Sequence, residues 1–449
     1  MSFDRSVLGS LVPKAEVLRP VGLSLGLAGA SAVLSLVMFA LVARASGPDR
    51  FGLIAMAFSA ASFLAVFALA GQEFLAVRSW SEYVQTGRHG LARGVIRFGW
   101  TTCALGAAAA ALAAAVLAWH LDAEPLVAVL VVAFVVTQMF CLYSSQLARV
   151  VSGIFDGVFH RDITWKAMVA LAAGAALLAG APFSAAAFFA VAAAGSALAV
   201  LLHVIAVRRA LPEAVRAAEP LHDRRTWTAR SFRIWIASVL EASSRHLEVV
   251  LLGIVLDPVA AGLYFAASRL ANVFAVVTDG MNSFSTKCIP ELYFAGQHAR
   301  LDAVLKHFAA ITTALTLAGL AAIAVLAAPL LGLFEASYAA HADVLLVLAA
   351  GTALNALVGP APGILLLLGR ETAYLVRIGL GLLARAACIV LFGALYGPFG
   401  AAAGVAAVTV ATGLLLLFAC RRLTGLDPSP FAFVGRRPAP DAAPAGGLS

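Results

Sequence analysis

Apolar segments of about 20 residues recur along the whole of this 449-residue chain. A helix of that length crosses the roughly 30 Å hydrocarbon core of a bilayer, and lipid admits only structures that satisfy every backbone polar group internally. The composition agrees, because 62% of the residues are hydrophobic and 12% are charged, whereas about a quarter of a soluble domain is charged. These features exclude a water-soluble globular protein and predict an all-α polytopic membrane protein.

Twelve segments are long and apolar enough to be transmembrane helices. The first six comprise residues 21–43, 51–71, 96–119, 125–147, 164–181 and 183–207. The second six comprise residues 234–256, 258–280, 307–333, 343–368, 373–395 and 398–420. Several are separated only by a turn such as Gly397-Pro398, which favours helices that turn back directly after leaving the membrane.

The basic residues indicate the orientation of these segments, because cytoplasmic loops are enriched in Lys and Arg. If the N-terminus is cytoplasmic, 26 of the 31 Lys and Arg residues lie in cytoplasmic segments, and only Arg44 and Arg50 lie outside. The other three, Arg245, Arg269 and Arg385, lie within predicted spans. Omitting one span would place consecutive loops on the wrong sides, so we expect both termini in the cytoplasm.

The longest polar stretch separates two related halves. We expect two pseudo-symmetric six-helix bundles, in residues 1–207 and 234–422, joined by a cytoplasmic linker in 208–233 and followed by a disordered cytoplasmic tail in 423–449. The segment from Pro48 aligns without gaps with the segment from Pro258, with eight identities in 27 residues. Both halves then start from the same side of the membrane. Many secondary transporters have two such repeats and hold their substrate between them.

Ionisable residues inside membrane spans are costly to insert and are commonly functional. In the span 234–256, Glu241, Arg245 and Glu248 are spaced by four and three residues, so they share one helix face. The pattern has two interpretations. It is either an ion-paired stripe that holds helices together, or a cavity wall at which Arg245 meets an anionic substrate while a carboxylate titrates.

Two further arginines, Arg269 and Arg385, lie too deep in their spans to reach a loop comfortably. Each needs an anion, which a carboxylate of the span 234–256 or a phosphate of a ligand could supply. Glu73 and Asp279 lie near predicted helix ends, where we expect interfacial positions.

The sequence lacks the motifs of several kinds of catalytic or metal site. The chain contains no G-x-x-x-x-G-K-[ST] phosphate loop and no H-E-x-x-H motif, and its five cysteines are scattered singly. The sequence therefore indicates no catalytic residues, no metal site and no cofactor. External loops of about ten residues or fewer leave little room for an acceptor site, so we expect no enzyme. The basic residues lie in short loops rather than in aromatic-rich patches, so we expect no nucleic-acid partner.

Three stretches carry a resemblance to a known family. Leu41–Gly52 is similar to the L-x-R-x-L-G-P-x-x-F-G-x-Y turn of polysaccharide-type flippases, although Ser46 replaces a common Leu. Glu248–Gly253 and Gly262–Leu270 resemble the acidic-x-x-hydrophobic-Gly helix and the G-x-Y-x-x-A-x-R-L helix of that family. Gly397–Gly404 resembles its G-x-x-G-A-A-x-A motif. These flippases export O-antigen, capsule and exopolysaccharide repeat units, and belong to the multidrug/oligosaccharidyl-lipid/polysaccharide superfamily.

The resemblance covers residues 21–422 and implies a function. It implies an inner-membrane flippase that moves a polyprenyl-pyrophosphate-linked oligosaccharide by alternating access, in contact with membrane lipids and with a polysaccharide polymerase and glycosyltransferases as partners. On this interpretation Arg245, Arg269 and Arg385 bind the substrate, and Glu241 or Glu248 couples transport to an ion. The alternatives are a lipid II flippase or a drug/sodium antiporter of the same superfamily, and a membrane-embedded polysaccharide polymerase or transferase.

Overall fold

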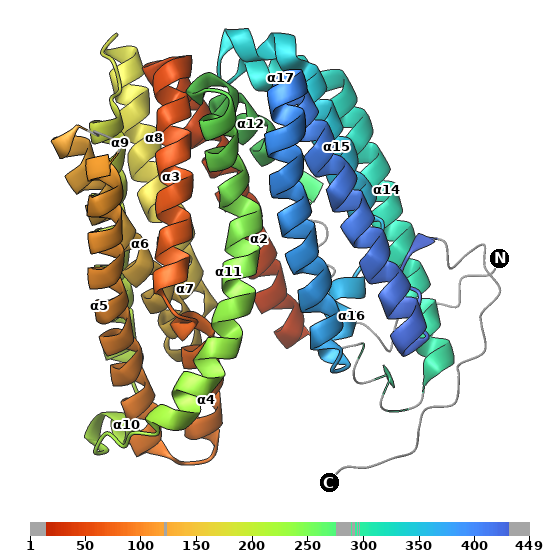
Figure 1. Ribbon diagram of the computed structural model, residues 1–449. Helices are drawn as coiled ribbons and strands as arrows, with labels where there is room; N and C mark the ends of the chain where they lie inside the picture. The colour runs from red at the N-terminus through yellow and green to blue at the C-terminus, as the bar shows by residue number, and fades with distance from the viewer. Residues whose placement is uncertain are drawn as a thin grey trace. The chain divides into compact units, whose positions relative to one another are not determined.

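The computed structural model describes residues 15–120, 124–274, 289, 292, 293, 295 and 297–430. Every regular element in these ranges is a helix (Figure 1), which confirms the predicted all-α class. The chain divides into two compact units, Met1–Leu247 and Glu248–Ser449. Most of the predicted tail, residues 431–449, and the end of the eighth predicted span, which includes Asp279, lie outside the described residues.

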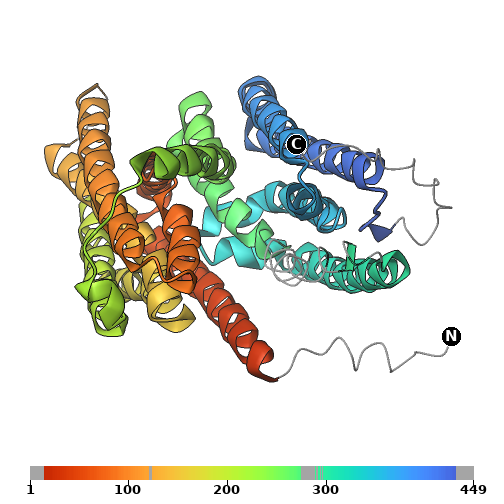
Figure 2. The same ribbon diagram turned by 90° about the horizontal axis from the view of Figure 1, so that it is seen from below.

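The first unit is a helical bundle around α6 (Pro125–Val151), which packs against α3 (Pro48–Ala68), α5 (His89–His120) and α9 (Ala185–Ala210). Figure 2 looks along several of these helices, coloured red to yellow-green, and shows them gathered together. The unit also contains α2 (Ala15–Ser46), α4 (Gln72–Gln85), α7 (Ile154–Phe159), the π-helical turn η1 (His160–Thr164), α8 (Trp165–Leu178), α10 (Glu213–Ala217) and most of α11 (Arg224–Val255).

Buried aromatic rings join the helices of the first unit. The ring of Phe58 on α3 lies 5.3 Å from that of Phe39 on α2 and 5.8 Å from that of Phe134 on α6. Trp165 on α8 and Phe188 on α9 each lie 6.1 Å from the same ring. Within lipid the hydrophobic effect does not drive helices together, so close packing of this kind provides much of the association energy.

The second unit consists of α12 (Pro258–Ala271), α14 (His298–Gly332), the 3₁₀ turn η2 (Ala336–His341), α15 (Ala342–Ala356), α16 (Ala361–Leu367) and α17 (Glu371–Thr424). In this unit α15 packs against α12, α14 and α17 (Figure 1). The predicted span 343–368 is divided into α15 and α16 by a turn in which Gly359 has a φ of 68°.

The repeated Pro motif marks the start of a helix in each half. Pro48 and Pro258 are the first residues of α3 and α12, a position that suits Pro because the missing N–H has no partner there. Asp257 caps α12, since its Oδ1 accepts a hydrogen bond of 2.7 Å from the backbone N–H of Ala260. Each aligned segment therefore begins at the N-terminus of a helix, and the repeat itself remains a prediction.

Eight helices in the described part of the chain are long and apolar enough to cross a membrane. One of them, α17, has 54 residues and contains two predicted spans. A straight helix of that length would measure about 80 Å, but Gly397 interrupts it with a φ of 65°, directly before Pro398. α8 and α12 have only 14 residues each, and α11 carries several charges. The count of twelve spans and the cytoplasmic termini remain predictions.

The polar stretch between the halves is partly helical. α9 extends to Ala210, α10 follows, and α11 begins at Arg224, so little of residues 208–233 is irregular. The boundary between the compact units falls after Leu247, inside α11. The first half of α11 belongs to the first unit and places some of its side chains in the core of that unit. Trp227, for example, is fully buried in a cluster with Leu75 and Tyr83 of α4.

Candidate functional site

Glu241 and Arg245 form an ion pair along α11. The Arg245 guanidinium lies 2.6 Å from Glu241 Oε1, and the side chains are 65% and 62% exposed. The two residues are four positions apart in the sequence. This spacing predicted that they share one helix face, and on that face they are in contact. A pair this exposed contributes little to stability in water, but in hydrocarbon two exposed charges would be costly. The exposed pair therefore indicates that this part of the predicted span faces water.

Glu248 forms a second, buried pair with Arg385 of α17 at 3.1 Å. Only 12% of the Glu248 side chain and 20% of the Arg385 side chain are exposed. The hydroxyl of Tyr264 on α12 donates a hydrogen bond of 2.6 Å to the other carboxylate oxygen. This cluster joins α11, α12 and α17 in the second unit and supplies the anion that the sequence required for Arg385.

Arg269 lies in the last turn of α12, where its guanidinium carbon is 4.8 Å from the centre of the Phe265 ring. This is a cation–π contact, in which the negative face of the ring attracts the cation. The predicted site residues are thus divided. Glu241 and Arg245 belong to the first unit, and Glu248, Arg269 and Arg385 belong to the second.

The sequence analysis missed two groups. Tyr264 completes the cluster around Glu248, although a tyrosine within an apolar helix gave no sign of that contact. Glu73, expected at an interface, is only 7% exposed. Ser238 of α11 donates a hydrogen bond of 3.0 Å to its Oε1 atom. Burial raises the pKa of Glu73, and the nearby charge of Glu241 raises this pKa further, while the hydrogen bonds lower it.

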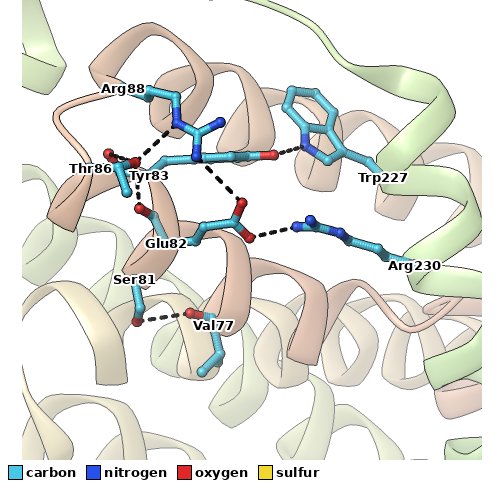
Figure 3. A network of polar contacts seen from close by, with 8 residues as sticks. All are labelled: Val77, Ser81, Glu82, Tyr83, Thr86, Arg88, Trp227 and Arg230. Atoms are coloured by element: carbon cyan, nitrogen blue, oxygen red, sulfur yellow. Dashed lines mark hydrogen bonds and ion pairs between the residues drawn. The ribbon is translucent and has the colours of Figure 1, made fainter. Parts of the chain in front are cut away.

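A polar network holds the start of α11 against α4 (Figure 3). Arg230 of α11 lies 2.7 Å from Glu82 Oε2, and Arg88 lies 3.8 Å from Oε1 of the same carboxylate. The indole N–H of Trp227 donates a hydrogen bond of 2.9 Å to the hydroxyl of Tyr83. These contacts fix the position of α11 along α4 and so bring Ser238 to Glu73.

A cavity of about 730 Å³ lies beside these helices in the first unit. Its lining is mostly apolar and comes from α3, α5 and α11, with Gln72 at the start of α4. Phe67, Phe232 and Trp235 contribute aromatic rings, and Thr102 and Ser231 contribute hydroxyls. The cavity has room for many water molecules, which occupy about 30 Å³ each.

The chain matches the family model described as "Polysaccharide biosynthesis protein" over residues 17–285, more than half of its length. No curated protein sequence matches it. The family match and the fold confirm the resemblance that the sequence motifs indicated.

Solved structures of transporters have a similar fold. A multidrug resistance MATE family transporter of the MOP superfamily, in an inward-facing conformation, has a TM-score of 0.71 and 13% identity, covering 87% of this chain and 94% of that one. The lipid II flippase MurJ has a TM-score of 0.60 and 13% identity, covering 88% and 87%. A MOP superfamily transporter from Pyrococcus furiosus has a TM-score of 0.61 and 13% identity, covering 90% and 93%.

Proposed function

We propose, from the premise that this chain belongs to the polysaccharide biosynthesis protein family, that it is a flippase for a polyprenyl-pyrophosphate-linked oligosaccharide. It acts by alternating access, in which the cavity for the polar head group opens to one side of the membrane at a time. It crosses the cytoplasmic membrane twelve times with both ends inside, and it passes repeat units from glycosyltransferases to a polysaccharide polymerase. It has no enzymatic activity of its own.

One observation carries this proposal, namely the exposed Arg245 guanidinium in the predicted span 234–256. A lipid-facing arginine would be costly there, so the side chain needs an aqueous cavity. A guanidinium in such a cavity is suited to a pyrophosphate, because its planar fork donates two parallel hydrogen bonds to phosphate oxygens. A cationic drug would be repelled by the same group. An anionic head group is therefore the substrate feature that the site favours.

The carboxylates beside the arginines suggest how binding is coupled to an ion. Glu241 is paired with Arg245, and Glu248 is paired with Arg385. Protonation of either carboxylate, or its binding of a sodium ion, would weaken the pair and release the guanidinium for a phosphate. Arg269 completes the set of three substrate-binding arginines. A bound proton or sodium ion shifts the equilibrium between the two conformations of the transporter only by the difference in its affinity for them.

Surface polysaccharide in cells that depend on this protein tests the proposal. Arg245→Ala and Arg269→Ala should abolish surface polysaccharide while the amount of protein in the membrane stays unchanged. Arg216→Ala is the matched control, because it removes a similarly exposed ion pair, with Glu213, outside the predicted spans. Normal polysaccharide in both of the first two variants would refute the binding role of these arginines.

A lipid II flippase is the second candidate, because MurJ shares the fold. Depletion of the protein distinguishes the two functions. Loss of surface polysaccharide from viable cells supports the first, and cell death supports the second.

A further inference from the structure

Glu73 lies in the first turn of α4, directly after a tight turn that presses against α11. The turn contains Ala70 and Gly71, with φ angles of 52° and 72°. A Cβ on Gly71 would lie 2.5 Å from the carbonyl oxygen of Ser231 and 2.9 Å from the backbone nitrogen of Trp235. The absence of a side chain at Gly71 thus allows the backbones to approach closely and closes the site around Glu73.

The Glu73 carboxyl group has one side-chain hydrogen-bond partner. Oε1 accepts from Ser238, whereas Oε2 is buried and has no partner among the described residues. In the same part of the chain, no Lys or Arg forms an ion pair with it. Buried carboxylates are normally paired or strongly hydrogen-bonded, because an isolated buried charge is costly. The unpartnered oxygen is consistent with a neutral carboxylic acid.

The other titratable groups around Glu73 come from each helix that packs against α4. On α11, Glu241 adds a like charge, and this residue is itself paired with Arg245. On α5, the Cys103 thiol is close enough to interact electrostatically with Glu73. On α6, the Tyr143 hydroxyl donates to the carbonyl oxygen of Ile96 at 3.1 Å and is therefore engaged elsewhere. Within the described part of the chain, the positive charge of Arg245 is paired with Glu241, and none of these groups forms an ion pair with Glu73.

We propose that Glu73 is a proton-binding site linked to anion binding at Arg245, which adds a third carboxyl group to the two expected to couple transport. The inference rests on the proposed function. The proton is taken up from water onto a carboxyl oxygen of Glu73 when the head group binds, and it returns to water when the head group is released. With Glu73 neutral, the Glu241–Arg245 pair has no net charge and accepts an anionic head group. With Glu73 ionised, the region is negative and repels it, so each ligand favours binding of the other.

Gln72 connects this site with the 730 Å³ cavity, because it precedes Glu73 in the chain and lines that cavity. Water in the cavity would bring a proton donor and acceptor to the first turn of α4.

Infrared spectroscopy of the reconstituted protein tests proton binding directly. We expect the wild-type protein to show the carbonyl band of a protonated carboxyl group, with a titration midpoint above the ordinary glutamate value of 4.5. Glu73→Gln should remove this band. Glu213→Gln should retain it, because the Glu213 side chain is 80% exposed and its partner is Arg216. A band that persists in Glu73→Gln, or a midpoint near 4.5, would overturn the proposal.

Ser238→Ala is a milder variant that covers the case in which Glu73→Gln does not fold. It removes the side-chain hydrogen bond to the carboxyl group, so the band should move to higher frequency and its titration midpoint should rise. An unchanged band and midpoint would contradict the proposed assignment.

Transport in vesicles tests the linkage, with undecaprenyl-pyrophosphate-linked oligosaccharide as the probe. A proton gradient with the lower pH on the side from which the probe moves should accelerate movement by the wild type and by Glu213→Gln but have no effect on Glu73→Gln. A full response of Glu73→Gln to the gradient would refute the linkage. If the wild type moves no probe at all, the proposed function fails, while the infrared titration still decides whether Glu73 binds a proton.

Discussion

The two units of the molecule each bury a glutamate, but they compensate the burial differently. In the second unit, Glu248 contacts Arg385 at 3.1 Å and accepts a hydrogen bond from Tyr264. In the first unit, Glu73 accepts a side-chain hydrogen bond from Ser238, has a like charge nearby at Glu241 and forms no ion pair with a described Lys or Arg. Glu248 therefore has a cation that compensates its charge, whereas no described Lys or Arg forms an ion pair with Glu73.

This difference affects the free-energy cost of protonating each carboxyl group. Protonation of Glu248 would leave a buried guanidinium without its counter-ion, which is costly. Protonation of Glu73 breaks no ion pair. Of two buried acids in one membrane protein, the unpaired one changes its protonation state at lower cost, so it is better placed to respond to a proton gradient.

The largest effect on stability should follow when Glu248 loses its partner cation, Arg385. Arg385→Ala leaves Glu248 buried and uncompensated, and we expect a loss of about 3–5 kcal/mol in the free energy of unfolding. Thermal unfolding of the purified protein measures it. The double variant Arg385→Ala with Glu248→Gln should recover much of the loss, because the buried charge is then gone. An equal loss in the double variant would show that the guanidinium stabilises by packing instead.

A substitution in the tight turn before Glu73 should give the next largest effect on stability. Gly71→Ala places a Cβ against the backbone of α11 and strains a left-handed residue, so we expect a loss of about 1–3 kcal/mol. Gly87→Ala is the control, because Gly87 has a similar φ of 69° but nothing within 4 Å of its Cβ position. If the two variants lose the same stability, strain alone explains the effect and the close approach to α11 contributes nothing.

Much of this comparison was not predictable from the sequence. The apolar periodicity predicted the helical class, and the i, i+4 spacing predicted the contact of Glu241 with Arg245. The contact of Glu248 with Arg385 spans 137 residues and depends on how α11 and α17 pack, which periodicity does not encode. Glu73 follows a predicted helix end, so it resembled an interfacial acid. Its burial results from the turn at Gly71 and from α11, the packing of which becomes visible only in three dimensions.

A smaller effect should appear in the pH dependence of the free energy of unfolding, and it should distinguish Glu73 from Glu248. The raised pKa of Glu73 means that the folded protein binds a proton more tightly than the unfolded chain does. Its contribution to stability is therefore complete below the unfolded value of 4.5 and is lost as the pH rises through the folded value. Glu73→Gln stays neutral and should abolish this loss. Thermal unfolding across the pH range measures it, and an unchanged pH profile in the variant would exclude Glu73 as its source.

The smallest effect on stability should come from the exposed pair. Arg245→Ala removes a pair whose side chains are 65% and 62% exposed, so the free energy of unfolding should change by about 0.5 kcal/mol or less. The same unfolding assay measures this. A loss comparable to that of Arg385→Ala would mean that Arg245 is a structural residue, and its proposed role in binding would lose its main support.

The most direct test of the account is movement of a polyprenyl-pyrophosphate-linked oligosaccharide across vesicles that contain only this protein. The account predicts that the wild type and Arg216→Ala move the lipid to the opposite leaflet and that Arg245→Ala does not, although all three are equally folded. Wild-type vesicles that behave like protein-free vesicles, or an Arg245→Ala variant that transports at the wild-type rate, would contradict it.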